Sequence, residues 1–140
     1  MATEKPKILI VDDLPANITV LKGLLKDLDV SLVSAHSGNE ALACMLDNDF
    51  ALVLMDVQMP EMDGFAATAK IRQSASNIRH TPIIAMTAHA MVGDRERCLE
   101  AGMNDYTSKP INPDELIEKI EAWIGKDGYV EETLKKASRR

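Results

Sequence analysis

Three short apolar runs in this chain each end at a side chain that can bind a metal ion or a phosphate. Residues 8–11 precede Asp12 and Asp13, residues 52–55 precede Asp56, and residues 83–86 precede Thr87. Short unbroken apolar runs are typical of strands that are buried on both faces of a parallel sheet. Open α/β sheets place their ligand crevice at the carboxyl end of the strands. We therefore expect these side chains to meet at one edge of a sheet, together with Lys109, which precedes Pro110.

Helical and extended segments alternate along the chain, which indicates an α/β fold. Ser37 and Glu40 have the spacing of a capping box, and Gly102 is placed to end the helix before it. Strands are expected at residues 8–11, 30–35, 50–55, 83–86 and 103–108, and helices after Pro15, Ser37, Asp63, Val92 and Asn112. This alternation implies right-handed crossovers and a doubly wound, five-stranded parallel sheet with helices on both faces.

The size and charge of the chain limit the number of its domains and the partners that it can bind. A length of 140 residues suits one domain, which we place at residues 5–125, followed by a charged extension or linker at residues 126–140. The net charge of −6 argues against a nucleic-acid partner. The 2 cysteines, Cys44 and Cys98, are expected to be reduced thiols. Because no stretch resembles a signal peptide and none approaches the ~20 apolar residues of a membrane span, we expect a soluble cytoplasmic protein without membrane contact.

Three carboxylates that share one crevice repel one another and need a cation. Two unit charges ~4 Å apart cost on the order of 4 kcal/mol at an effective dielectric constant of about 20. Mg²⁺ prefers oxygen ligands and typically uses one or two carboxylates plus phosphate oxygens. The pattern therefore predicts phosphoryl transfer, in which positioning and charge stabilisation supply most of the catalysis. The candidate roles are Asp56 as nucleophile, Asp12 and Asp13 as metal-binding residues, Lys109 as the partner of acceptor or phosphate, and Thr87 as a phosphate hydrogen-bond donor.

Other interpretations of these residues are weaker. A single strand-end aspartate is commonly a turn former, so the joint pattern over several strands carries the prediction. The chain has no G-x-x-x-x-G-K-[ST] stretch, and the turn after the first strand lacks glycine, which excludes a P-loop and argues against a dinucleotide site. A phosphatase would use an acid two residues after its nucleophile, where this chain has Gln58. The site is suited to accept a phosphoryl group and poorly equipped to release it quickly.

Longer stretches around these residues resemble the receiver domain of two-component response regulators over residues 5–125. The matching stretches are residues 8–13, 55–64, 86–88, 101–106 and 109–110. The resemblance implies a flavodoxin-like sheet with strand order 2-1-3-4-5 and a cis bond between Lys109 and Pro110. It also implies a signalling switch that is not an enzyme beyond its own phosphorylation and dephosphorylation. Thr107 departs from the family, which more usually has an apolar residue there.

The resemblance also implies how the site would work. Asp56 would take phosphate from a phosphohistidine on a histidine kinase or a histidine phosphotransfer protein, with Mg²⁺ bound. The metal ligands would be Asp13, Asp56 and the backbone carbonyl of Gln58, and Asp12 would place a bound water. Gln58 and His89 flank the phosphorylation site at positions that tune the lifetime of the phosphate.

The same resemblance implies an output. Thr87 and Tyr106 would form the switch, and a downstream protein would bind the face made by the fourth helix, fifth strand and fifth helix. Phosphorylation could also bring two copies together as a homodimer. Residues 57–64 and 86–91 are most similar to receivers that are attached to hybrid histidine kinases or serve phosphorelays, so the chain is a stand-alone receiver or a fragment of a hybrid kinase. The alternative is an interaction module that acts independently of phosphorylation.

Overall fold

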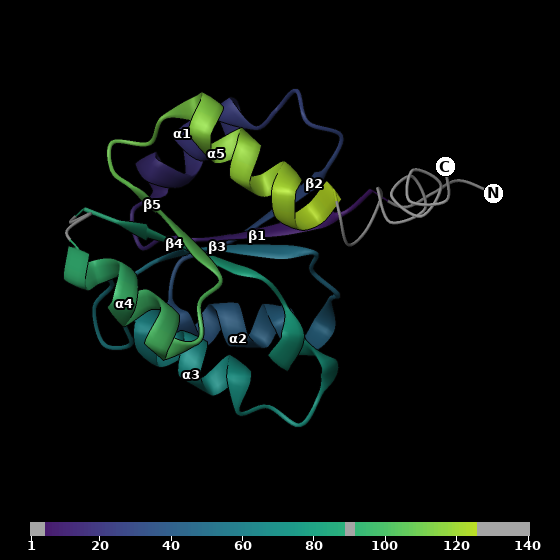
Figure 1. Ribbon diagram of the computed structural model, residues 1–140. Helices are drawn as coiled ribbons and strands as arrows, with labels where there is room; N and C mark the ends of the chain where they lie inside the picture. The colour runs from purple at the N-terminus through teal and green to yellow at the C-terminus, as the bar shows by residue number, and fades with distance from the viewer. Residues whose placement is uncertain (1–4, 89–91, 126–140) are drawn as a thin grey trace, which may run out of the picture.

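The apolar runs form the strands of one parallel sheet in the computed structural model, which describes residues 5–88 and 92–125 (Figure 1). The strand order is β2-β1-β3-β4-β5, so the predicted topology is confirmed. The strands are β1 (Lys7–Val11), β2 (Ser31–Ala35), β3 (Leu52–Asp56), β4 (Ile83–Thr87) and β5 (Asp105–Ser108). Because every neighbouring pair is parallel, the carboxyl ends of the strands share one edge.

Helices cover both faces of this sheet, as predicted. Figure 1 shows α1 and α5 on one face and α2, α3 and α4 on the other. The helices are α1 (Pro15–Leu24), α2 (Gly38–Asp47), α3 (Gly64–Arg72), α4 (Val92–Ala101) and α5 (Pro113–Ile120), with a 3₁₀ turn η1 (Asn77–His80) and a π turn η2 (Glu121–Gly125). The turn η1 lies in the connector between α3 and β4, within residues 74–81. Within the described part of the chain, no helix is long and apolar enough to cross a membrane.

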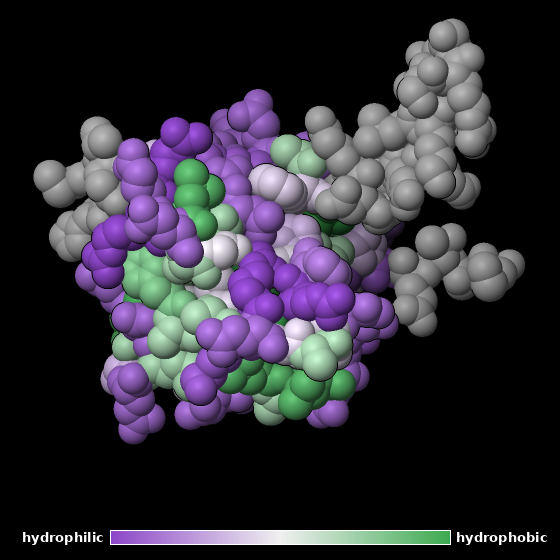
Figure 2. Space-filling model, turned by 60° about the horizontal axis from the view of Figure 1, so that its bottom comes forward, coloured by the Kyte–Doolittle hydropathy of each residue, from purple (hydrophilic) through white to green (hydrophobic). Residues whose placement is uncertain are grey.

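Side chains along the central strands alternate between two apolar layers. Leu9 and Val11 belong to the core cluster on the side of α2 and α3, whereas Ile8 and Ile10 belong to the cluster on the side of α1 and α5. Every residue of β3 and β4 is buried, which explains why these strands are unbroken apolar runs in the sequence. Figure 2 turns the lower side of the molecule forward and shows hydrophobic surface interrupted by hydrophilic side chains.

Both β3 and β4 end one residue later than predicted, and β3 also begins two residues later, at Leu52. β3 ends at Asp56 and β4 ends at Thr87, so both residues are held by the sheet itself. The register places Asp56 opposite Met86, the residue before Thr87. The hydrogen-bond ladder of the sheet therefore fixes the backbone of the candidate nucleophile and of the candidate switch residue.

The last strand starts later than predicted because the end of α4 uses the preceding residues. Gly102 has a φ of 104°, a left-handed conformation that glycine adopts without steric cost. Its N–H donates to the carbonyl of Leu99 over 3.0 Å, and the N–H of Met103 donates to that of Cys98 over 2.9 Å. These two bonds form a Schellman cap, so β5 begins only at Asp105.

The unusual Thr107 has a partner. It is buried in β5, and its hydroxyl donates to a carboxylate oxygen of Glu115 on α5 over 3.1 Å. A buried hydroxyl costs little when it is hydrogen-bonded. The departure from the family pattern thus links β5 to α5.

Candidate functional site

The three predicted carboxylates meet at the carboxyl edge of the sheet. Asp12 and Asp13 directly follow β1, and Asp56 is the last residue of β3, the strand beside it. Each offers an oxygen atom, and these oxygens lie within 4.8 Å of one another. Asp12 and Asp56 are buried, at 0% and 3% exposure, and Asp13 is half-buried. Sequence reasoning predicted this convergence, and the structure confirms it.

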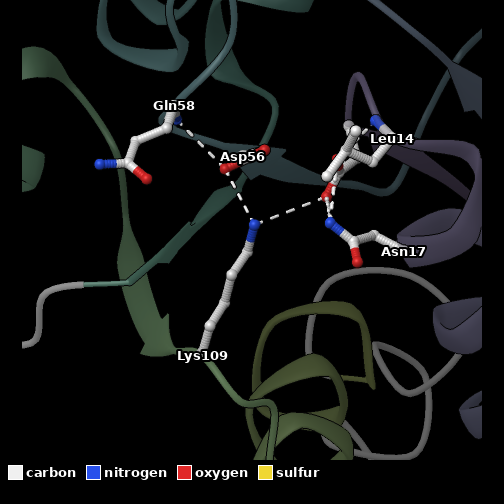
Figure 3. Close-up of polar contacts among 6 residues, drawn as sticks. Leu14, Asn17, Asp56, Gln58 and Lys109 are labelled. Atoms are coloured by element: carbon white, nitrogen blue, oxygen red, sulfur yellow. Dashed lines mark hydrogen bonds and ion pairs between the residues drawn. The ribbon is translucent and has the colours of Figure 1, made fainter.

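Lys109 brings a positive charge to the same place. Its Nζ lies 3.2 Å from Oδ1 of Asp56 and 3.7 Å from Oδ2 of Asp12 (Figure 3). Its backbone N–H donates to the carbonyl of Thr87 over 2.7 Å, which anchors the segment after β5 to the end of β4. The bond between Lys109 and Pro110 is cis, as the resemblance implies. The ammonium therefore points into the acidic pocket.

Asp56 is held in an environment that resists its ionisation. Burial raises the pKa of its carboxyl above the usual 3.8, and the neighbouring Asp12 carboxylate also raises this pKa. The N–H of Gln58, which donates to Asp56 Oδ1 over 3.1 Å, and the Lys109 ammonium lower it. Burial is the largest of these effects and prevails. A cation placed among the carboxylates would stabilise the ionised form of Asp56.

The loop after β3 is pressed close against the backbone of Asp56. The N–H of Gly64 donates to the carbonyl of Val57 over 3.1 Å. A Cβ atom added at Gly64 would lie only 2.4 Å from the carbonyl oxygen of Asp56 and 2.8 Å from Cα of Val57. Only glycine therefore permits this approach, which starts α3 beside the site. Asp63 caps α3 by accepting the N–H of Ala66 over 2.8 Å.

Asp12 is held by two groups that the sequence reasoning did not identify. Asn17 on the first turn of α1 donates its side-chain amide to both carboxylate oxygens, over 3.3 Å and 3.2 Å. The N–H of Leu14 donates to Oδ1 over 2.9 Å, and Figure 3 shows both contacts. The only signal in the sequence is a short amide five residues after the aspartate, which is unremarkable at a helix start.

Thr87 and Tyr106 lie on neighbouring strands. Thr87 is buried and lines a cavity of about 540 Å³. The loop after β3, Phe65 on α3 and Arg97 on α4 line the same cavity. The guanidinium carbon of Arg97 lies 4.6 Å from the centroid of the Phe65 ring. Tyr106 is half-buried, and Nζ of Lys119 lies 5.3 Å from the centroid of its ring. His89 lies outside the described residues. The switch roles of Thr87 and Tyr106 stay a prediction.

The donor set fits a hard divalent cation. Three carboxylates supply oxygen atoms at mutual distances that one ion can span, and softer nitrogen or sulfur ligands are absent from this described cluster. Such oxygen-only sites suit Mg²⁺. His36 and His80 are exposed, and no disulfide joins Cys44 to Cys98.

Comparison with known proteins decides the family. A model of the response regulator receiver domain matches residues 8–121, which include every residue of this site. The chain belongs to this family.

Relatives and solved structures add detail to this assignment. The receiver domain is 40% identical over 127 residues to the sensor protein GacS of Pseudomonas syringae, a match that covers 89% of this chain but only 14% of GacS. It is 41% identical to the receiver domain of the sensor histidine kinase PA1611 of Pseudomonas aeruginosa, with a TM-score of 0.78 and coverage of 88% of this chain and 99% of that one. That structure has a magnesium ion coordinated in its active-site cleft.

A third structure contains a partner. The receiver domain of the Saccharomyces cerevisiae response regulator Ssk1, in complex with the histidine phosphotransfer protein Ypd1, matches with a TM-score of 0.79 and 28% identity. The match covers 90% of this chain and 93% of that one. Residues 8–121 thus form a receiver domain of two-component or phosphorelay signalling, which is a signalling switch and is homologous to the receivers of hybrid kinases.

Proposed function

We propose that Asp56 is the phosphoacceptor of this receiver domain. The observation that carries the proposal is the cluster of three carboxylates, with oxygens within 4.8 Å of one another, whose buried member Asp56 also lies 3.2 Å from the Lys109 ammonium. A carboxylate oxygen of Asp56 attacks the phosphorus atom of a phosphohistidine. The P–N bond breaks as the new P–O bond forms, the imidazole nitrogen retains the bonding electrons, and an acyl phosphate results.

The other residues hold the charges that make this transfer possible. Asp13, Asp56 and the backbone carbonyl of Gln58 would hold Mg²⁺, and Asp12 would place a water beside the ion. Mg²⁺ supplies positive charge to the oxygens of the phosphoryl group. Lys109 pairs with the acceptor and then with the phosphoryl oxygens, and Thr87 donates a hydrogen bond to one of them. The magnesium in the PA1611 receiver supports this assignment.

Release of the phosphate is slow in this proposal. An acid or base beside the acyl phosphate would be needed to activate water efficiently. The position two residues after Asp56 is Gln58, whose neutral amide cannot take a proton from water. The protein therefore catalyses its own phosphorylation and dephosphorylation and has no turnover on unrelated phosphate esters.

The output uses the face of α4, β5 and α5. Thr87 moves toward the phosphoryl group, the ring of Tyr106 turns inward behind it, and the altered face changes the affinity for a downstream protein or a second copy of the chain. The donor is a histidine kinase or a histidine phosphotransfer protein, which the Ypd1–Ssk1 complex supports. The receiver domain spans residues 5–125, and the proposed extension at residues 126–140 lies outside the described residues.

A second proposal concerns the kind of receiver that this domain is. The match to GacS covers only 14% of that sensor protein, and the PA1611 match is a receiver domain of a sensor histidine kinase. These matches favour the receiver of a hybrid histidine kinase over a stand-alone regulator.

The phosphoacceptor assignment is tested by intact-mass spectrometry. Wild-type protein incubated with Mg²⁺ and a small phosphodonor such as phosphoramidate is expected to gain the mass of one phosphoryl group, about 80 Da. Asp56→Asn should gain nothing, whereas Asp49→Asn, which changes an exposed aspartate at the other end of β3, should behave like wild type. Equal labelling of Asp56→Asn and wild type would refute the assignment.

A further inference from the structure

The Asp12 carboxylate is almost fully occupied by donors before any cation binds. Its Oδ1 accepts the N–H of Leu14 over 2.9 Å and the Asn17 amide over 3.3 Å, and its Oδ2 accepts the same amide over 3.2 Å. Lys109 Nζ lies 3.7 Å from Oδ2. A carboxylate offers about four lone-pair sites. A single amide that reaches both oxygens also fixes rotation about the Cβ–Cγ bond of Asp12.

The hydrogen bonds from the Asn17 amide to Asp12 affect the position of the Lys109 ammonium. Asp12 is completely buried, so an unpaired carboxylate there would be strongly unfavourable. Because the Asn17 amide and the Leu14 N–H satisfy it, Lys109 is not required for that purpose. The ammonium accordingly lies nearer Asp56, at 3.2 Å, than Asp12, at 3.7 Å.

We propose that Asn17 is a positioning residue that satisfies Asp12 with a neutral donor and so keeps the Lys109 ammonium directed at Asp56 and its incoming phosphoryl group. This inference rests on the proposed function of Asp56. Asn17 touches neither the phosphoryl group nor the metal ion in this proposal, and it acts through Asp12 and Lys109. A charged donor at this position would neutralise the cluster and weaken its attraction for a cation, whereas an amide leaves the negative charge in place.

Substitution of Asn17 should lower the phosphorylation rate without weakening Mg²⁺ binding. In Asn17→Ala, Asp12 loses the amide and draws Lys109 away from Asp56, so the phosphorylation rate at saturating Mg²⁺ should fall about tenfold. The less satisfied carboxylate cluster should bind Mg²⁺ as tightly as wild type or tighter. A role in merely holding the metal site together would instead weaken Mg²⁺ binding, and high Mg²⁺ would then restore the rate.

The experiment measures both properties on the same samples. Isothermal titration gives the Mg²⁺ dissociation constant, and mass spectrometry with phosphoramidate at saturating Mg²⁺ gives the phosphorylation rate. Thr19→Ala is the matched control, because this exposed residue lies on the same helix and its hydroxyl donates to the backbone carbonyl of Pro15 in that helix. Asn17→Gln keeps the amide on a longer side chain and should recover part of the lost rate. It also serves as the test variant if the alanine variant does not fold.

The outcomes are distinct from a failure of the phosphoacceptor assignment. If wild type is not phosphorylated at Asp56, the proposed function itself is wrong. If wild type is phosphorylated and Asn17→Ala matches it in rate, the Asn17 inference alone is overturned. A rate that recovers fully at high Mg²⁺ would also overturn it. A lower rate at saturating Mg²⁺ with undiminished Mg²⁺ affinity supports it.

Discussion

Two lysine–aspartate pairs in this receiver domain have the same length and opposite surroundings. Lys109 lies 3.2 Å from Asp56, and Lys119 lies 3.2 Å from Asp105. The Asp56 side chain is only 4% exposed, whereas the Asp105 side chain is 28% exposed. Distance alone therefore says little about what an ion pair does.

The neighbours of each pair explain the contrast. Asp56 shares its pocket with two further carboxylates, so Lys109 leaves an excess of negative charge. Asp105 also accepts the indole N–H of Trp123 over 3.2 Å and the N–H of Tyr106 over 2.8 Å, and its one lysine balances it. The first pair belongs to a cluster with excess negative charge, while the second is a satisfied, part-buried contact between β5 and α5.

The sharpest test of this comparison is to remove each lysine. Lys109→Met is expected to slow phosphorylation of Asp56 about 100-fold, because a fixed charge near the transferring group is lost. Lys119→Met should change the rate by less than a factor of about two, since Lys119 pairs with Asp105 and not with the carboxylates of the site. Mass-spectrometric time courses with Mg²⁺ and phosphoramidate measure both. Similar rates for the two variants would mean that burial does not distinguish the pairs.

Replacing Asp56 or Asp105 with asparagine should change the free energy of unfolding in opposite directions. In metal-free protein, Asp56→Asn is expected to raise the free energy of unfolding by about 1–2 kcal/mol, within the usual range of single substitutions. The reason is that burial raises the pKa of Asp56 in the folded state. Urea unfolding in EDTA measures the effect, and added Mg²⁺ should reduce it, because wild type then gains the cation that it lacks.

The pH dependence of that difference follows from the sign of the shift. Above pH 3.8 the unfolded chain releases the Asp56 proton first, while the folded protein retains it, so wild-type stability falls as pH rises through the window up to the raised pKa. The advantage of Asp56→Asn should be full above the raised pKa and disappear near pH 3.8 and below. An advantage that is constant with pH would show that the carboxylate charge is not its cause.

Asp105→Asn is the counterpart and should destabilise the protein by about 1 kcal/mol, since a charge-assisted bond to Lys119 is lost. Trp123 is the single tryptophan of the chain, and its indole N–H donates to Asp105. Its fluorescence emission should therefore shift in this variant and not in Asp56→Asn. A stabilising effect of Asp105→Asn would contradict the view that this pair is satisfied.

The smallest expected effect is that of Lys119→Met on stability. The ammonium lies 5.3 Å from the Tyr106 ring centroid and binds Asp105, and both contacts are partly exposed. We expect a loss of about 0.5 kcal/mol in urea unfolding. Arg97→Met is a suitable comparison for this small loss of stability. It removes the Arg97 guanidinium of α4 from the Phe65 ring of α3, and Arg97 is also exposed.

Much of the fold could be predicted from local patterns. The unbroken apolar runs predicted doubly buried strands, the capping residues Ser37 and Asn112 marked helix starts, and Gly102 marked a helix end. The convergence of Asp12, Asp13 and Asp56 followed from parallel strands that end at one edge. The start of β5 was predicted two residues early, because the cap of α4 competes for the same residues.

Other features depended on contacts that spacing does not encode. Asn17 looks like an ordinary residue of a first helical turn, and only the path of the chain after β1 brings its amide to both oxygens of Asp12. The hydroxyl of Thr107 meets Glu115, and Lys119 meets both Asp105 and Tyr106, only once α5 has packed against β5.

The sequence by itself therefore determined the sheet, its order and the acidic edge, because those follow from repeating patterns of burial and from the resemblance to receivers. The tertiary structure alone decided how each charge is paired. Pairing depends on burial and on distances of a few ångströms between segments remote in the chain, and a linear pattern of residue types carries neither.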